Sequence, residues 1–450
     1  MHTNKFIKTL SLSRNIFYTF LTQIPIQIFG IISGILIARL LGPEGKGAYA
    51  IYHANAQLLV TFFSFSLNTA LIYFLSSGKG NPSKILGLSI LFVCLGTLLM
   101  LLMLGVFSIP YVNRLMIPSG YNGGIFFYWM GIFSFFTLAN TIVSGFFQGY
   151  KKFGIINKIA IYNSILSLFL IAAVFFLNRY DYFNGKLIHI LWILAVVAII
   201  NFFQYLYKFF KHFDIKPDFK TNYKEDAYPV LYFLIPAHLS IVVNFFNYRL
   251  NLWVLNYYLD EVVIGLFALA VNISAFFTMI SVPISKVLMP YLSSEPENNR
   301  GNIFSRYSRL NFSLIFFGAI ISFLLAEFLI PLVYGKDFAG SVVYFKWILP
   351  GILFGCQTKI FSAYIIACGR QKYNLYATII ALIANTIFSI VLIPMIGGMG
   401  AVWAYNITNF TLLIVGMGAS HYALSLPVAN HYFLTMADIK RILKDAARKK

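Results

Sequence analysis

Five charged side chains lie within or at the edge of long apolar runs of this sequence, where charge is rare and points to function. They are Arg39, Arg249, Lys286, Lys359 and Glu327. Placing one charge in a bilayer costs about 2.5 to 3.5 kcal/mol, so four unpaired cations would cost on the order of 10 kcal/mol. One carboxylate cannot neutralise four cations. We therefore predict a hydrated cavity that receives an anion, with Arg and Lys as ligands of its phosphate groups.

The four cations differ in how strongly they point to such a cavity. Lys359 lies in the middle of its run, beside Gln357 and Thr358, and is the strongest candidate. Arg39 and Lys286 lie near the ends of their runs, from which a long side chain can reach the membrane surface. Arg249 lies off the face of its helix that carries asparagines, and could reach outward in the same way.

Amide side chains recur at helical spacing within three of the runs. Steps of three and four residues place each set on one face of a helix. A wet cavity is favoured for them, because an amide that faces lipid has no partner, whereas a Ser/Thr set at 274–285 fits a helix-packing seam equally well. The amides expected to line the cavity are Gln23, Gln27, Gln57, Asn68, Asn244, Asn247 and Asn251.

Motifs for enzymatic chemistry are missing from the sequence. The segment GPEGKG at 42–47 resembles a phosphate-binding loop only superficially, since Leu40 replaces the first glycine and Gly47 replaces the required Ser or Thr. There is no HExxH motif, and no carboxylate pair or Ser, His and Asp set stands at a usable spacing. We predict that the protein is not an enzyme and holds neither a metal nor a cofactor.

Membrane-spanning helices must position the charged and amide residues. Of the 450 residues 59% are hydrophobic and only 11% are charged, and the mean hydropathy is +0.78. These values exceed what the core of a soluble domain requires, and apolar runs of twenty or more residues are long enough to cross a bilayer. We predict an all-α membrane protein with twelve spans. They are expected at about 15–38, 48–76, 85–109, 125–148, 155–177, 187–207, 228–257, 262–291, 310–333, 341–368, 373–394 and 400–423.

The basic residues set the expected orientation of these spans. By our placement, 24 of the 34 Lys and Arg residues fall on the side that holds both termini and seven fall on the other. Positive loops stay in the cytoplasm, so both termini are predicted to be cytoplasmic. The net charge of +20 then reflects membrane topology and gives no reason to expect nucleic acid as a partner.

A repeat divides the chain into halves. The segment LGPEGKGAYAI at 41–51 aligns with LDEVVIGLFAL at 259–269, and QGYKKFG at 148–154 aligns with CGRQKYN at 368–374. Two six-span lobes of the same orientation predict a pseudo-two-fold axis along the membrane normal, with a substrate cleft between the lobes. Residues 40–50 are expected to form a turn at the outer surface that exposes its charges. The predicted divisions are an N-terminus at 1–14, an N-lobe at 15–207, a linker at 208–227, a C-lobe at 228–423 and a tail at 424–450.

The tail ends in a basic amphipathic helix. Apolar side chains of residues 437–450 fall on one helix face and Lys and Arg side chains fall on the other. Such a helix is expected to lie on anionic lipids of the inner leaflet, which contribute about 1 kcal/mol per basic residue.

Three segments of the chain resemble a known family of transporters. They are RLLGPEGKGAYAIY at 39–52, YGKDFAGSVVYFKWILPG at 334–351, and the stretch 365–404. With the twelve spans, they are similar to the polysaccharide-type flippases of the multidrug/oligosaccharidyl-lipid/polysaccharide (MOP) superfamily, over essentially the whole chain. The resemblance implies a two-lobed bundle that alternates between inward-open and outward-open states. It implies export of an undecaprenyl-pyrophosphate-linked glycan repeat unit across the bacterial inner membrane through a cationic cavity.

The resemblance also bears on single residues and on partners. Arg39 occupies the position of the arginine that commonly precedes the LG motif. Arg249 and Asn251 match a frequent Arg-x-Asp pattern with Asn in place of Asp, which weakens a proton or Na⁺ site there and leaves ion coupling open. The implied partners are the lipid-linked glycan, anionic lipids and glycan-assembly proteins such as a polymerase, and the implied transport unit is a monomer.

Two alternative functions stay open. A multidrug or cation exporter of the same superfamily would need embedded carboxylates for its cargo, and Glu327 alone supports that poorly. A peptidoglycan-precursor flippase would keep the mechanism and change only the glycan.

Overall fold

The computed structural model describes residues 12–76, 81–121, 124–220, 228–423, 432–436 and 438, and all regular secondary structure in this described part is helical. The helices of the N-lobe are α1 (Leu12–Phe63), α2 (Leu67–Ser76), α3 (Pro82–Val106), α4 (Pro110–Met116), α5 (Gly124–Gly149), α6 (Phe153–Arg179) and α7 (Leu187–His212). Those of the C-lobe are α8 (Tyr228–Tyr258), α9 (Glu261–Ser274), the 3₁₀ turn η2 (Ala275–Phe277), α10 (Thr278–Ser294), α11 (Glu297–Tyr334), the 3₁₀ turn η3 (Lys336–Phe338), α12 (Ser341–Ala367), α13 (Lys372–Ile396), α14 (Gly398–Gly418) and the π-helical turn Ala419–Ala423.

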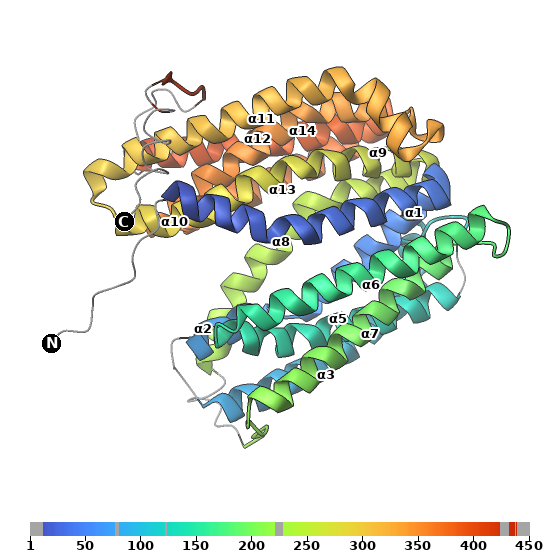
Figure 1. Cartoon of the computed structure of the whole chain (residues 1–450), viewed down its shortest axis with the longest axis horizontal. Helices are drawn as coiled ribbons and strands as arrows, with labels where there is room; N and C mark the ends of the chain where they lie inside the picture. The colour runs from blue at the N-terminus through green and yellow to red at the C-terminus, as the bar shows by residue number, and fades with distance from the viewer. Residues whose placement is uncertain are drawn as a thin grey trace.

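Two bundles of long helices make up the molecule, and α1 and α8 run between them (Figure 1). Ten helical segments in the described part are long and apolar enough to cross a membrane. The first of these, Ile24–Phe63, contains two spans because non-helical backbone at Gly42 divides it, and α8 adds a twelfth. The predicted all-α membrane fold with twelve spans in two lobes is confirmed.

The sequence repeat brings two glycines together where the lobes meet. A Cβ atom on Gly47 would lie 1.9 Å from the carbonyl oxygen of Glu261, and one on Gly265 would lie 1.9 Å from that of Pro43. The backbones of α1 and α9 therefore touch, which only glycine permits. Gly47 and Gly265 are counterparts in the repeat, and a reciprocal contact of this kind is expected where two-fold-related elements meet. We call this part of the molecule the hairpin end.

The turn expected at 40–50 is present as a break at Gly42 that divides α1 into two helical segments, and Glu44 is exposed as expected. Gly42 adopts a φ of +65° and a ψ of −176°, which favour glycine, and Pro43 starts the next helical segment at once. Residues 45–48 are buried, and Lys46 is only 4% exposed. The expectation that Lys46 is at the outer surface was wrong, because contact with α9 buries this stretch.

A second break divides the polar face expected for the second span. The turn Ser64–Ser66 separates α1 from α2, and Phe65 and Ser66 both have positive φ. Beyond the break, Asn68 packs on α5, where a Cβ on Gly145 would lie 2.9 Å from the Asn68 Oδ1 atom. Polar residues before and after the turn therefore face different neighbours, and Asn68 is in a helix interface.

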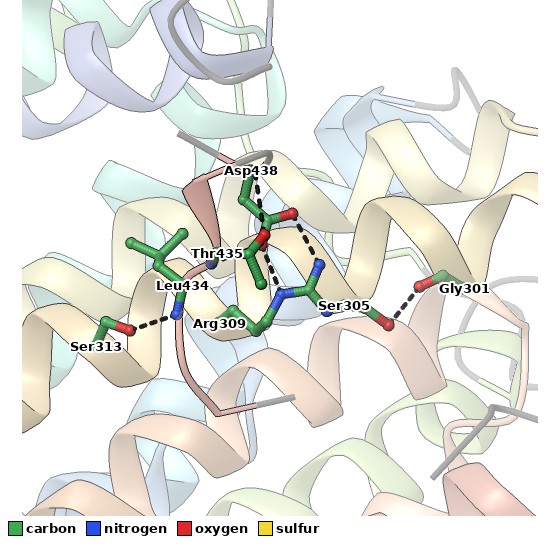
Figure 2. A network of polar contacts seen from close by, with 7 residues as sticks. All are labelled: Gly301, Ser305, Arg309, Ser313, Leu434, Thr435 and Asp438. Carbon is green, nitrogen blue, oxygen red and sulfur yellow. Dashed lines mark hydrogen bonds and ion pairs between the residues drawn. The ribbon is translucent and has the colours of Figure 1, made fainter. Parts of the chain in front are cut away.

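The described residues of the tail are held on α11 by a polar network (Figure 2). Arg309 donates one hydrogen bond from Nε and one from Nη2 to the Asp438 carboxylate, both at 2.8 Å. Thr435 and Asp438 cap each other, and the Leu434 amide donates to Ser313 Oγ at 2.9 Å. Burial opposes ionisation of Asp438, but hydrogen bonds from Arg309 and Thr435 outweigh it and lower its pKa to about 2. Apart from Asp438, the amphipathic helix predicted at 437–450 lies outside the described residues.

Candidate functional site

Two cavities of about 360 Å³ each lie within the bundle. The first, the interlobe cavity, is lined by α1, α6 and α7 of the N-lobe and by α8, α9, η2, α11 and α14 of the C-lobe. The second, the C-lobe cavity, is lined only by α8, α10, α12, α13 and α14. Tyr248 contributes to both linings. Each cavity has a volume typical of small-molecule sites.

The interlobe cavity carries positive charge from both lobes. Lys46 comes from α1, and its Nζ atom lies 4.9 Å from the centre of the Tyr49 ring. Arg249 comes from α8, and its Nη2 donates to Gln57 Oε1 at 2.8 Å. None of the described residues that line this cavity is Asp or Glu. The arrangement suits an anion, for which both cations can form charge-assisted hydrogen bonds.

Aromatic and hydroxyl-bearing side chains complete the interlobe cavity. Tyr248, Tyr334 and Tyr405 line it together with Gln27 and Asn272. Aromatic faces with a few polar groups are typical of pockets that orient an organic ligand. The cavity can therefore accommodate an anionic group and a polar organic group next to it.

The C-lobe cavity carries a second pair of cations. Lys286 comes from α10 and Lys359 from α12, and no Asp or Glu is among the described lining residues. Among described residues, neither ammonium group has a hydrogen bond or an ion pair. Lys286 lies at the middle of α10, well beyond the start of α9 at the hairpin end, and Asn374 lies in the first turn of α13, so the cavity is displaced from the hairpin end. Its other polar groups are Asn244, Ser285, Thr358, Ser362, Thr378 and Asn409.

Arg39 lines neither of these cavities. Its Nε donates to the Val333 carbonyl at 2.7 Å and its Nη2 to that of Leu332 at 2.5 Å. Carbonyls in the last turn of a helix lack intrahelical partners, so Arg39 caps α11 and joins the two lobes.

Other polar contacts hold the hairpin end closed. The Glu261 carboxylate accepts from the Ser119 amide at 2.7 Å and from its hydroxyl at 2.8 Å. On α8, Asn256 donates to the carbonyl of Leu115 at 3.0 Å. These contacts and the glycine pair connect the two lobes where the chain reverses.

The asparagines of α8 face other helices more than they face a cavity. Asn247 is buried and donates to the Thr378 carbonyl at 3.0 Å, and Asn251 Oδ1 accepts from Ser389 Oγ at 2.7 Å. Asn244 does line the C-lobe cavity, and Asn251 contributes to the interlobe cavity. Asn247 lines neither cavity: its side-chain NH2 donates to α13, and its Oδ1 is buried without a hydrogen-bond partner among the described residues. Arg249 lies off this seam and therefore reaches the interlobe cavity.

The glutamines predicted to line the cavity, and Glu327, lie at different places in the structure. Gln27 lines the interlobe cavity, and Gln57 adjoins it through Arg249. The side chain of Gln23 lies outside the described residues. Glu327 is exposed and pairs with Lys346 at 2.6 Å on a surface that belongs to neither cavity.

Sequence reasoning missed Lys46, because a lysine among glycines beside a proline is typical of a surface turn. The repeat contained a usable signal, since it aligned Gly47 with Gly265 inside an apolar segment. In the described part of the chain, no group of three or more His, Cys, Asp or Glu residues could hold a metal ion.

Comparison with known proteins places this geometry in context. The family model described as "Polysaccharide biosynthesis protein" matches residues 12–295. The capsular polysaccharide biosynthesis protein CapF of Staphylococcus aureus is 22% identical over 411 residues, which cover 89% of this chain and 97% of CapF.

Solved structures show the same fold. The lipid II flippase MurJ in an inward closed conformation has a TM-score of 0.75 at 18% identity, covering 95% of this chain and 90% of MurJ. An inward-facing multidrug resistance MATE family transporter of the MOP superfamily has a TM-score of 0.68 at 13% identity, covering 94% of this chain and 96% of that one. At these identities the likeness concerns the fold alone.

Proposed function

The chain belongs to the polysaccharide biosynthesis protein family and is a multi-pass membrane protein with the MOP transporter fold, and from this premise we propose that it flips an anionic lipid-linked glycan. The cargo we propose is an undecaprenyl-pyrophosphate-linked repeat unit. Arg249, Lys286 and Lys359 are its proposed phosphate ligands, and Lys46 joins them. In the closed state Arg39 keeps the hairpin end shut.

One observation carries this proposal: both cavities contain two cations and no described carboxylate. A transported cation would meet like charge in either cavity and would be repelled. A pyrophosphate would instead neutralise side chains whose charge is otherwise costly to keep away from water. The tyrosines and amides beside Arg249 offer stacking surfaces and hydrogen bonds to a sugar.

The orientation we propose follows from the distribution of Lys and Arg. Both termini are cytoplasmic, the hairpin end faces outward, and the membrane is the bacterial inner membrane. The C-lobe cavity then lies toward the cytoplasm, where a lipid-linked glycan is assembled. Cysteine labelling from one side of the membrane, at exposed Tyr111 for the outer side and exposed Lys211 for the inner side, tests this orientation.

Transport itself is tested with purified protein in lipid vesicles. The vesicles contain a fluorescent undecaprenyl-pyrophosphate disaccharide, and a membrane-impermeant quencher reports how much of it lies in the outer leaflet. We expect the wild-type protein to move the lipid between leaflets and Arg249→Gln to abolish movement. Lys346→Gln is the matched control, because Lys346 pairs with exposed Glu327 outside both cavities. Equal movement in protein-free vesicles, or full activity of Arg249→Gln, would contradict the proposal.

The same vesicles separate the alternatives. Replacing the probe with a lipid-linked peptidoglycan precursor distinguishes the two glycan cargoes. Uptake of a cationic dye, with no movement of any lipid-linked glycan, would favour the multidrug exporter. Imposed proton and Na⁺ gradients test whether transport is coupled to either ion.

A further inference from the structure

The two cation pairs differ in what happens to them when the lobes move. Lys46 belongs to the N-lobe and Arg249 to the C-lobe, so the pair exists only while those lobes are in contact. Lys286 and Lys359 both belong to the C-lobe, and every described residue lining their cavity does as well. Rigid-body rocking of one lobe against the other would split the first pair and leave the second intact.

Packing within the C-lobe supports this difference. The helix α12, which carries Lys359, is fixed to α11 through buried Gln357, whose Nε2 donates to Ser308 Oγ and whose Oε1 accepts from Asn311. On α8, Asn247 is fixed to α13 through the Thr378 carbonyl. The first contacts join one wall, α12, to α11 of the same lobe, and the second joins two walls, α8 and α13; none of them involves the N-lobe.

The side chain of Tyr248 stands between the two sites. It lines both cavities and is 57% exposed, so no close packing holds it in place. The two cavities therefore adjoin at Tyr248, and Arg249, the next residue on α8, lines the interlobe cavity.

We infer that the C-lobe lysines Lys286 and Lys359 form a permanent binding site for a lipid pyrophosphate, from which the anion passes by Tyr248 to a transient site at Lys46 and Arg249. The inference rests on the proposed function and deepens it. The C-lobe site binds in every state of the transporter, whereas the interlobe site forms only when the hairpin end is closed. The headgroup thus stays attached to one lobe while the other moves.

The test compares binding in a closed and an opened protein. In a background with Cys94, Cys356 and Cys368 replaced by serine, Ser119→Cys and Glu261→Cys joined by a short bis-methanethiosulfonate cross-linker lock the hairpin end, because the cross-linker spans the gap that the Glu261 side chain now fills to reach Ser119. Gly265→Val opens it, because its Cβ would collide with the Pro43 carbonyl. Each protein, in nanodiscs of neutral lipid, is titrated with radiolabelled farnesyl pyrophosphate. The site variants are K286Q/K359Q and K46Q/R249Q, with K346Q as the control.

We expect K286Q/K359Q to weaken binding by about tenfold or more in the opened protein, where only the C-lobe site remains. In the locked protein the same variant should retain binding at the interlobe site. K46Q/R249Q should weaken binding only in the locked protein, and K346Q should bind as its parent does. Undiminished binding of K286Q/K359Q in the opened protein would overturn the inference, as would equal loss in both states for K46Q/R249Q.

Two further arms identify the ligand and separate this inference from the proposed function. Displacement of the probe by excess phosphatidylglycerol as readily as by unlabelled farnesyl pyrophosphate would mean a phospholipid site and would overturn the assignment. Equally strong displacement by inorganic pyrophosphate would show that the isoprenoid is not recognised and would also overturn it. If binding depended on the state of the hairpin end but no lipid flipped in vesicles, the two binding sites would be upheld and glycan transport refuted. If lipid flipped but binding did not depend on that state, glycan transport would be upheld and the two binding sites refuted.

Discussion

Replacing Gly265 with alanine should separate the two lobes at the hairpin end. The added Cβ would lie 1.9 Å from the Pro43 carbonyl oxygen, and neither atom can move without its backbone, because the Cβ is bonded directly to Cα and the oxygen is a main-chain atom. Ordinary contact requires roughly 3.4 Å, so α9 must retreat from α1 by about 1.5 Å. That movement exceeds what the hydrogen bonds from Ser119 to Glu261, at 2.7 and 2.8 Å, can tolerate.

The magnitude follows from the loss of one of those two bonds, since the flexible Glu261 side chain can keep the other. A hydrogen bond to a charged group contributes about 1.5 to 3 kcal/mol, and each 1.4 kcal/mol changes an equilibrium about tenfold. The closed population should therefore fall by about ten- to a hundredfold relative to the open one. Spin labels at exposed Tyr111 of the N-lobe and exposed Asp337 of the C-lobe report the separation by pulsed electron resonance.

A matched glycine provides the control. A Cβ on Gly105 meets nothing within 4 Å, so Gly105→Ala should leave the distance distribution unchanged. Gly47→Ala should open the hairpin end as Gly265→Ala does, and the double variant should add little, because both substitutions break one contact. If Gly265→Ala and Gly105→Ala gave the same distribution, the contact between the backbones would not control closure.

Three further predictions concern single side chains. Lys46→Met should raise the midpoint of thermal unfolding, because a buried cation without a described carboxylate partner costs about 2.5 to 3.5 kcal/mol. The same variant should abolish flipping in vesicles. A lower unfolding midpoint would contradict this reasoning. Asn247→Ala should lower the free energy of unfolding by about 0.6 to 1.7 kcal/mol, because it loses the hydrogen bond to α13, whereas Asn244→Ala should change that free energy little. Thermal unfolding in detergent compares the two variants, and equal losses of stability would argue against a packing seam at Asn247. Asp438→Asn should speed amide hydrogen exchange at residues 432–436. In the wild-type protein, protection from exchange should be constant from about pH 5 to 9, because the pKa of Asp438 is lowered from 3.8 to about 2 and the ion pair with Arg309 loses its stability only as the pH falls through the range between these two values. Protection that changes near pH 6 would refute this reasoning.

The fold was predictable because charge-free runs of membrane length leave few alternatives. The repeat added the relation between the lobes, and the contact between Gly47 and Gly265 lies where two-fold-related segments should meet. The break within residues 40–50 was predicted, but the burial of Lys46 beside it was not. The turn at Ser64–Ser66 was not predicted, and a helical wheel drawn through it gives the wrong neighbours for Asn68.

The chemistry of the candidate site was predictable from the sequence, but the residues that line it were less so. Embedded cations in excess of acids pointed to an anion, and the structure places Arg249, Lys286 and Lys359 at cavities. Amides gave a weaker signal because a buried carbonyl of a neighbouring helix can accept from the side-chain NH2 group of an amide as water does. Asn247 is the clear example, and sequence spacing cannot distinguish the two environments.

The helix α8 has the proportions of a lever. Its second half is fixed to the C-lobe from Asn247 onward, while His238 in its first half lies 3.4 Å from the hydroxyl of Ser66, just before α2. These two points are about 13 Å apart along the helix axis. A tilt of about 15° at the fixed point would move the far end by about 3.5 Å, enough to break or make its contact with the N-lobe. Small rotations at one end of the molecule are thereby magnified into the opening or sealing of the other.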